Sequence, residues 1–374
     1  MGRAEKPAPR SAPEGDWRSE LRHAITTVAE LARVLELSPA ERAGAERAAE
    51  HGLPLRITPY YLSLADRHDP DCPIRRQVVP RLDEAESCRG EDVDPLAERA
   101  HEIAPGLVRR YPDRALLLVT ASCAVHCRFC TRTRLVASAG AGRRGAEPLE
   151  RLAPALGELG RQREIREVIV SGGDPLTLAT PRLVAIVAAL RRIPHIEVIR
   201  IGTRTPATLP SRITPRLVAA LRPYHPLWVM SHFNHPRELT PAAAEACRRL
   251  VDAGFPVMNQ TVLLRGVNDQ AEVLAELWRG LVRWRVRPYY LMQMDPVAGA
   301  GHLRTPLERG VELMAALQGK LSGLALPKLV VDTPGGAGKV PLGPSYVVAR
   351  EPGRTRLRTP AGGEVDYLDP PARS

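Results

Sequence analysis

The chain has 374 residues, 44% of them hydrophobic, and a formal net charge of +11 at pH 7. This length and composition allow one large buried core, which excludes a disordered protein and a small disulfide-stapled domain. No apolar run reaches the roughly 18 residues that a membrane-spanning helix needs, and the N-terminus lacks the apolar centre of a secretory signal. We therefore expect a cytoplasmic enzyme without a membrane partner.

The positive charge raises the question of a nucleic-acid partner, because Lys and Arg neutralise phosphates. The basic residues are, however, spread along the chain with acidic residues between them. Only 4% of the residues are aromatic, which leaves few platforms on which bases can stack. The sequence therefore does not favour binding to nucleic acid.

The first hundred or so residues differ from the rest of the chain. Residues 1–16 are rich in Pro, Gly and charge, which predicts a flexible N-terminus. Residues 17–108 are expected to form a mainly helical segment, because apolar residues recur at helical spacing in 17–35 and 39–51. Ser38 has the residue type and position of an N-cap for the second of these helices.

From Arg114 onward, short β-branched or leucine-rich runs alternate with longer amphipathic stretches, which is typical of βα units. The expected strands are 115–120, 167–171, 197–202, 227–233, 257–264 and 286–293. The expected helices are 147–159, 181–193, 215–221, 241–253, 270–283 and 306–321. Six units within residues 109–322 predict an α/β fold with a partial (βα)6 TIM-like barrel, and a doubly wound open sheet would show the same alternation.

Three cysteines, Cys123, Cys127 and Cys130, follow the first expected strand. Iron-sulfur clusters normally have four thiolate ligands, so three cysteines suit a cubane cluster with one iron open to a small molecule. A zinc site with three cysteines and one histidine is the alternative, with His126 or a distant histidine as the fourth ligand. In either interpretation this loop carries a metal centre.

Gly172, Gly173 and Asp174 end the second expected strand. Paired glycines let the backbone approach a ligand amine closely, but the same residues also make an ordinary turn between a strand and a helix. Arg110 and Arg114 precede the first strand and offer guanidinium groups that suit a phosphate, or else form a charged loop.

Lys339 follows a glycine-rich run that begins after Asp332. The run is not a phosphate loop of an NTPase, because Val340 stands where Ser or Thr is needed. A lysine on a glycine-rich hairpin suits imine formation with a carbonyl cofactor, and the alternative is a solvated surface lysine. His232 and Gln260, in two further expected strands, are candidates to face the same pocket.

Together these motifs resemble the lysine 2,3-aminomutase family of the radical S-adenosylmethionine (SAM) superfamily, over about residues 69–340. The resemblance is carried in order by Asp-Pro-Asp-Cys-Pro-Ile-Arg at 69–75, Arg-Tyr-Pro-Asp-Arg at 110–114, the three cysteines with Thr-Arg-Thr-Arg at 131–134, Ser-Gly-Gly-Asp at 171–174, Arg-Ile-Gly-Thr-Arg at 200–204, His-Phe-Asn-His-Pro at 232–236, Leu-Arg-Gly-Val-Asn-Asp at 264–269 and Arg-Pro-Tyr-Tyr at 287–290.

The resemblance implies a radical-SAM partial barrel preceded by the helical segment and followed, in residues 323–374, by a hairpin with the pyridoxal phosphate lysine. It implies a [4Fe-4S] cluster on the three cysteines, SAM on the open iron, and pyridoxal 5′-phosphate as a second cofactor. The implied reaction begins with one-electron cleavage of SAM. The resulting radical removes hydrogen from the β-carbon of an amino acid held as a pyridoxal imine, and the nitrogen then moves from the α- to the β-carbon.

The same resemblance assigns roles to single residues. Lys339 is the expected imine lysine. The cofactor phosphate is assigned to Arg110, Tyr111 and Arg114. SAM and further cofactor contacts are assigned to Gly172, Gly173, Asp174, His232 and Gln260. Arg132 is placed to pair with the substrate carboxylate.

Two acidic residues, Asp295 and Asp332, match the pair that holds the distal ammonium in the family's lysine enzymes. Two carboxylates favour a cationic side chain and repel glutamate. Lysine is therefore the first choice of substrate. Arginine and ornithine stay open, because a difference of one or two methylenes separates ligands by only about 1 to 3 kcal/mol.

The chain departs from the family pattern at several positions. No cysteine follows Cys247, so we expect no structural zinc near the C-terminus, and the choice between a monomer and a homo-oligomer stays open. Phe129 replaces a histidine beside the last cluster cysteine, Met292 stands where an aromatic residue is common, and Ala337 interrupts the glycine run.

The leading hypothesis is an isomerase that makes β-lysine and receives electrons from a one-electron donor such as flavodoxin or ferredoxin. The alternatives are supply of β-lysine for modification of a translation factor, the same shift on arginine or ornithine, or a non-catalytic or RNA-directed iron-sulfur protein. RNA binding would have no use for Lys339, Arg132, Asp295 and Asp332 together.

Overall fold

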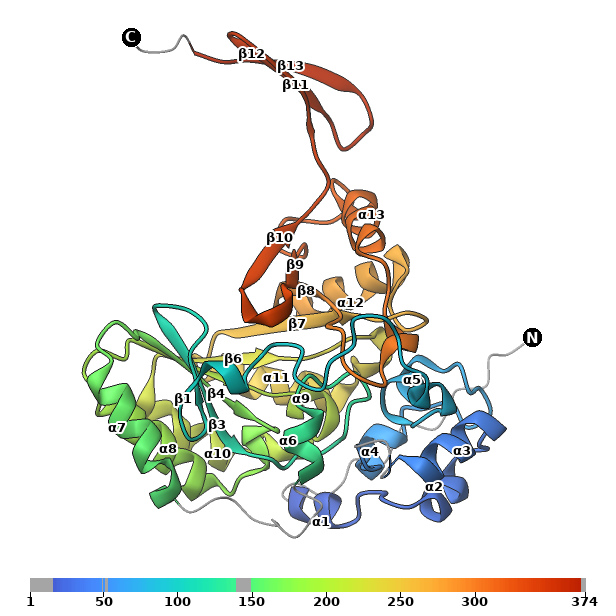
Figure 1. Ribbon diagram of the computed structural model, residues 1–374, viewed down its shortest axis with the longest axis vertical. Helices are drawn as coiled ribbons and strands as arrows, with labels where there is room; N and C mark the ends of the chain where they lie inside the picture. The colour runs from blue at the N-terminus through green and yellow to red at the C-terminus, as the bar shows by residue number, and fades with distance from the viewer. Residues whose placement is uncertain (1–15, 49, 51–52, 139–148, 371–374) are drawn as a thin grey trace.

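A ten-stranded sheet forms the centre of the computed structural model, which describes residues 16–48, 50, 53–138 and 149–370. Its strands lie side by side in chain order, β1 to β10, and those from β3 to β9 are parallel (Figure 1). Their bounds are β1 Glu102–Ala104, β2 Leu107–Val108, β3 Arg114–Thr120, β4 Glu167–Gly172, β5 Val198–Gly202, β6 Leu227–Ser231, β7 Val257–Leu263, β8 Arg287–Gln293, β9 Lys328–Asp332 and β10 Lys339–Leu342.

Helices connect the parallel strands and cover the outside of the curved sheet (Figure 1). In the barrel they are α6 Thr133–Ser138, α7 Ala153–Arg161, α8 Thr180–Arg191, α9 Thr205–Thr208, α10 Pro215–Leu221, α11 Pro241–Asp252, α12 Ala271–Arg283 and α13 Leu307–Leu317. α10 and α11 each begin with a threonine N-cap followed by proline. The threonine hydroxyl accepts a hydrogen bond from a backbone amide of the first turn, and proline has no amide hydrogen that would need a partner there. No helix within the described ranges is long and apolar enough to cross a membrane.

The predicted α/β barrel is confirmed, and all six expected strands are present with ends within a few residues of the prediction. The structure adds a seventh parallel strand, β9, which pairs with β8. Its apolar centre is only Leu329, Val330 and Val331, too short a run to be recognised as a barrel strand from the pattern alone. The start of the first expected helix, at 147–148, lies outside the described residues.

The N-terminal segment is helical but more broken than the sequence predicts. Its helices are α1 Trp17–Arg22, α2 Val28–Val34, α3 Pro39–Arg47, α4 Pro59–Leu62 and α5 Pro73–Val78. Ile25 interrupts the first expected helix, because its backbone pairs with Ile57. Ser38 is the N-cap of α3, as predicted, and forms a capping box with Glu41. Residues 1–15, the bulk of the expected flexible N-terminus, lie outside the described part of the chain.

Hydrogen bonds join this segment to the backbone of the loop that carries the three cysteines. The Arg56 side chain donates to the Cys123 carbonyl at 2.9 Å, and the Arg56 carbonyl accepts from the His126 amide at 2.8 Å. The Arg128 amide donates to the Gln77 carbonyl at 2.9 Å. The helical segment therefore holds the cysteine loop against the open end of the barrel.

After β9 the chain turns back into β10 as an antiparallel hairpin, and Lys339 pairs with Asp332 across it. The expected lysine hairpin is thus present. A second sheet of β11 Val347–Glu351, β12 Arg354–Arg358 and β13 Glu364–Leu368 follows and stands apart from the barrel (Figure 1). Its side chains are mostly exposed.

Candidate active site

The carboxyl ends of the parallel strands surround a cavity of about 590 Å³. This is the end of a barrel at which βα loops place functional side chains. Every site residue predicted from the sequence lines it, namely Arg110, Tyr111, Arg114, Cys123, Cys127, Cys130, Arg132, Gly172, Gly173, Asp174, His232, Gln260, Asp295, Asp332 and Lys339. The fold therefore brings residues from distant parts of the chain, such as Arg110 and Lys339, into the lining of one cavity.

The cysteine loop follows β3 and presents three thiols to the cavity. Burial, followed by the neighbouring thiols, raises the pKa of Cys123 and raises the pKa of Cys130 to about 11. Thiols in such a place become thiolate ligands only when a cation is bound, so this donor set fits a metal cluster. His126 does not line the cavity, and its Nδ1 donates to the Pro54 carbonyl at 2.7 Å, which disfavours it as a fourth zinc ligand.

Gly172 and Gly173 allow β4 to end directly against the cysteine loop. A Cβ atom at Gly172 would lie 2.2 Å from the Thr120 carbonyl oxygen, and one at Gly173 would lie 2.4 Å from that of Ser122. Gly172 also has a positive φ of 122°. The two glycines are therefore required by this close backbone approach, whatever ligand contacts they make.

Asp174 is already surrounded by hydrogen-bond donors from the loop after β5. Its carboxylate accepts from the Thr203 hydroxyl at 2.7 Å, the Arg204 amide at 2.8 Å and the Thr205 hydroxyl at 3.0 Å. It also accepts from the Leu176 amide at 3.0 Å. Burial is the main cause that raises its pKa. In the structure this side chain joins the ends of β4 and β5, and its expected contact with SAM stays a prediction.

Lys339 lies at one end of the cavity and forms an ion pair with Asp332. Asp332 also accepts from Arg110 at 3.1 Å, so a single carboxylate balances two cations. The Lys339 amide donates to the Tyr111 hydroxyl at 2.9 Å, and the Arg114 guanidinium lies 3.7 Å from the centre of the Tyr111 ring. The three residues expected to hold a phosphate thus gather beside the expected imine lysine.

The glycine run before Lys339 has two kinds of position. Gly336 has a φ of 78°, and a Cβ atom there would lie 2.8 Å from the Leu96 carbonyl oxygen. Ala337 has a φ of −70°, which any residue adopts. The alanine that interrupts the glycine run is therefore compatible with the hairpin.

Arg132 is fixed by a carboxylate that the sequence patterns do not reveal. Glu98 accepts from Arg132 Nε at 2.9 Å and Nη2 at 2.7 Å, and its side chain is only 4% exposed. Arg132 Nη1 donates to the Ser171 hydroxyl at 3.2 Å. Glu98 lines the cavity as well, and it lies outside all of the motifs in the sequence.

Asp295 follows β8 and faces the same end of the cavity as Asp332. Burial, followed by repulsion from Asp332, raises the pKa of Asp295 to about 7. A cation that enters this end would favour its ionised form. The two carboxylates expected to hold a distal ammonium are thus close enough to influence each other.

His232 directly follows β6, Gln260 lies within β7, and both line the cavity. Burial lowers the pKa of His232 to about 3, and its Nε2 lies 3.0 Å from the Asn234 amide oxygen. The ring is therefore neutral at physiological pH. It lies 5.6 Å from the Phe129 ring, so the residue that replaces the family's histidine forms an aromatic pair here.

Family models match two parts of the chain. One, described as the radical SAM superfamily, matches residues 117–277, and the other, described as lysine-2,3-aminomutase, matches residues 314–373. The L-lysine 2,3-aminomutases of Fusobacterium nucleatum and Clostridium subterminale are each 44% identical to this chain over 95% of its length, which covers 82% and 84% of those proteins. The chain belongs to the lysine 2,3-aminomutase family.

This aminomutase is accordingly a radical SAM isomerase, with a [4Fe-4S] cluster, SAM and pyridoxal phosphate as cofactors. The glutamate 2,3-aminomutase of Clostridioides difficile is also similar, at 39% identity over 96% of this chain and 84% of that protein. The cavity suits all three groups, since thiols lie in one part of its wall and a lysine with two arginines in another. Its volume lies within the range of about 300–1,000 Å³ that is usual for ligand sites.

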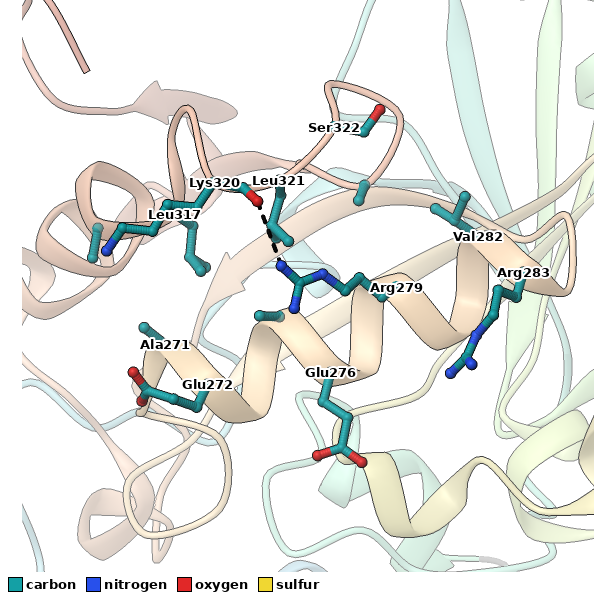
Figure 2. A pocket seen from close by; sticks show the side chains of 13 residues that line it. Ala271, Glu272, Glu276, Arg279, Val282, Arg283, Leu317, Lys320, Leu321 and Ser322 are labelled. Atoms are coloured by element: carbon teal, nitrogen blue, oxygen red, sulfur yellow. Dashed lines mark hydrogen bonds between the residues drawn. The ribbon is translucent and has the colours of Figure 1, made fainter. Parts of the chain in front are cut away.

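A second hollow, of about 690 Å³, lies on the outside of the aminomutase between α12 and the loop after α13 (Figure 2). In Figure 2, Arg279 of α12 reaches toward the backbone of Lys320, whose carbonyl it contacts at 3.4 Å. No cysteine or histidine belongs to the residues that line it. This surface therefore lacks the side chains that the chemistry requires.

Proposed function

We propose that this aminomutase acts on L-lysine and moves the α-amino group to the β-carbon, which gives β-lysine. The observation that carries the proposal is the pair of carboxylates, Asp295 and Asp332, at the end of the cavity that also contains Lys339. Two acids at one end attract the distal ammonium of lysine. The side chain of glutamate would meet the same two acids and be repelled.

In this proposal Cys123, Cys127 and Cys130 bind the cluster, and Lys339 with Arg110, Tyr111 and Arg114 binds pyridoxal phosphate. When bound, the cluster supplies the electron, SAM the hydrogen-abstracting radical and pyridoxal phosphate the π-system over which nitrogen migrates. SAM is assigned to Gly172, Gly173, Asp174, His232 and Gln260. Arg132 orients the substrate by its carboxylate, and Glu98 keeps the Arg132 guanidinium in one position.

Asp332 has two roles in this proposal. In the cofactor-free protein it neutralises Lys339 and Arg110. Once Lys339 is committed to pyridoxal phosphate, the distal ammonium of the substrate would take the place of the Lys339 ammonium beside Asp332. The carboxylate thus stays paired throughout, which avoids the large cost of an isolated buried charge.

The decisive test is product formation by the anaerobically reconstituted protein. It is loaded with iron, sulfide, pyridoxal phosphate and SAM, reduced chemically, and given lysine, arginine, ornithine or glutamate separately. We expect a β-amino acid from lysine and none from glutamate. Product from arginine or ornithine at a higher kcat/KM would move the assignment to that substrate, and no product from any cationic amino acid would remove it.

A variant tests the carboxylate pair itself. Asp295→Asn is expected to lower kcat/KM for lysine about 100-fold, equal to about 2.7 kcal/mol, because it removes one of two charges that hold the ammonium. Glu308→Gln, at an exposed position of α13, serves as the control. An unchanged kcat/KM in Asp295→Asn would contradict the assignment of this end of the cavity.

We also infer a cytoplasmic location and reduced flavodoxin or ferredoxin as the electron donor. All six cysteines are free, as expected in a reducing compartment.

A homo-oligomer is supported by exposed apolar side chains on the C-terminal sheet, among them Val365 at 51% and Leu368 at 75% exposure. Size measurement of the reconstituted enzyme tests the last point.

A further inference from the structure

A buried arginine contacts one of the three cluster cysteines. Arg204 lies just beyond the end of β5, and its Nη1 donates to the Cys127 sulfur at 2.7 Å. Its side chain is 8% exposed. The motifs in the sequence include Arg204 but give it no role, because its partners lie far away in the chain. The contact places a permanent positive charge beside a sulfur that is proposed to bind the cluster.

The other end of the guanidinium is held by residues from three parts of the fold. Arg204 Nη2 lies 2.7 Å from the Tyr61 hydroxyl and 2.8 Å from Glu238 Oε1, and it also donates to the Gln77 amide oxygen. Tyr61 and Gln77 belong to α4 and α5 of the N-terminal segment. The Tyr61 hydroxyl donates to Glu238 at 2.7 Å. These contacts leave the guanidinium little freedom to turn away from Cys127.

The charge around Arg204 is balanced on one side only. Glu238 is fully buried and pairs with it, while the side that faces the cavity carries the sulfur. Arg204 Nε is buried and has no hydrogen-bond partner among the described residues. Reduction of a cluster adds negative charge, and N–H donors and positive charges near its sulfurs favour the reduced form. A low dielectric environment strengthens that effect.

We propose that Arg204 is a positioning residue that raises the reduction potential of the cluster through Cys127, and that the N-terminal helical segment holds Arg204 in place. This inference rests on the proposed cluster site at Cys123, Cys127 and Cys130. It gives the N-terminal segment a part in the reaction, although no residue of α1 to α5 lines the cavity. The electron still comes from the external donor, and Arg204 alters only how readily the cluster accepts it.

The test is a redox titration of the reconstituted full-length enzyme without SAM. Electron paramagnetic resonance measures the amount of reduced cluster at each potential. In Arg204→Gln the equilibrium constant for one-electron reduction should fall about tenfold, a shift of about 59 mV to lower potential. Arg204→Lys keeps the charge but loses the fork of donors. Its reduction potential should lie between those of the natural chain and Arg204→Gln. Tyr61→Phe keeps Arg204 but removes one of its tethers. The equilibrium constant for one-electron reduction should then fall about two- to threefold.

Arg212→Lys is the matched control. Arg212 is likewise a buried arginine of the loop region after β5, but it donates to the Leu176 and Leu178 carbonyls at 2.7 and 3.0 Å and not to a cysteine. It should leave the potential unchanged even if it lowers stability. Iron and sulfide per chain are measured in every variant, so that loss of the cluster is separated from a change in its potential.

Several outcomes would overturn the inference. One is a full iron content with an unchanged potential in Arg204→Gln. Another is weaker SAM binding with an unchanged potential, since Arg204 would then be a SAM ligand. If Arg204→Gln takes up no cluster, unchanged potentials in Arg204→Lys and Tyr61→Phe decide against it. A wild-type protein that takes up no cluster would instead contradict the proposed function.

Discussion

Three aspartates in the cavity differ in what surrounds them, although the sequence shows all three simply as acids at strand ends. Asp174 accepts several hydrogen bonds from the loop after β5, and Asp332 lies between two cations. The pKa of Asp295 is raised mainly by burial and by the charge of Asp332. The differences in environment suit the three acids to different tasks: joining strands, balancing Lys339 and receiving a cation.

Asp295 gives a pH-dependent prediction for the cofactor-free protein. Burial raises its pKa in the folded protein to about 7, above the ordinary value of 3.8 for an aspartate. The folded state therefore binds the proton more tightly, and the charge costs stability progressively as pH rises from about 4 to about 7. Asp295→Asn should be more stable than the natural chain by up to about 4 kcal/mol near pH 8, and the gap should shrink toward pH 4.

Urea unfolding of the two proteins across this pH range measures the gap. Glu308→Gln, on the exposed surface of α13, is the control and should show no comparable pH-dependent gap. A gap that is the same at every pH would contradict the raised pKa of Asp295.

Glu98 gives a second prediction, on buried and exposed ion pairs. Glu98→Gln leaves Arg132 without its charged partner in a largely buried place, which should lower the free energy of unfolding by about 3 kcal/mol. Glu245 pairs with Arg248 and Arg249 on the exposed surface, so Glu245→Gln should cost at most about 1 kcal/mol. Chemical denaturation measures both values, and equal losses would contradict the contrast.

At the level of elements, the β9–β10 hairpin shows why composition alone does not describe the glycine run. Gly336 needs a positive φ and has no room for a Cβ atom, whereas Ala337 has neither restriction. Gly336→Ala should therefore displace the hairpin and lower both thermal stability and the amount of pyridoxal phosphate bound. Ala337→Gly should cost only about 0.5–1 kcal/mol, through the greater freedom of the unfolded chain.

Calorimetry and the absorbance of bound pyridoxal phosphate test this pair of variants. The expected order is the natural chain, then Ala337→Gly, then Gly336→Ala, in both measurements. If Gly336→Ala bound pyridoxal phosphate normally, the hairpin geometry would not control the position of Lys339.

The strands and the loops that carry cavity residues were predictable because their signals are local. The β-branched runs alternate with helical spacing, and the cysteines and glycines stand in short motifs. Glu98 and the seventh strand were not predictable, because a lone acid and a three-residue apolar run carry no distinctive pattern. Two of the three tethers of Arg204, Tyr61 and Gln77, lie 143 and 127 positions away in the chain, and only the fold brings them together.

Over the whole molecule, the N-terminal segment and the barrel share one network of buried contacts. The Thr58 hydroxyl donates to the Thr208 carbonyl at 2.6 Å, and Glu84 pairs with Arg128 of the cysteine loop. Trp17 is 6% exposed, and the Arg212 guanidinium lies 4.4 Å from the centre of its ring. Because barrel residues complete the core of the N-terminal segment, the segment should be unstable when the barrel is unfolded.

We therefore expect the N-terminal segment and the barrel to unfold together. Two variants, each with a single tryptophan, report on the two regions: one keeps only Trp17 of α1, and the other keeps only Trp278, which is fully buried in α12. Each midpoint is compared with the midpoint from circular dichroism of the same variant, which corrects for differences in stability between them. Coincident fluorescence and dichroism transitions in both variants are expected for one cooperative unit. A Trp17 transition at a lower midpoint would mean that the segment unfolds alone. Arg204 would then lose its contacts with Tyr61 and Gln77 before the barrel unfolds.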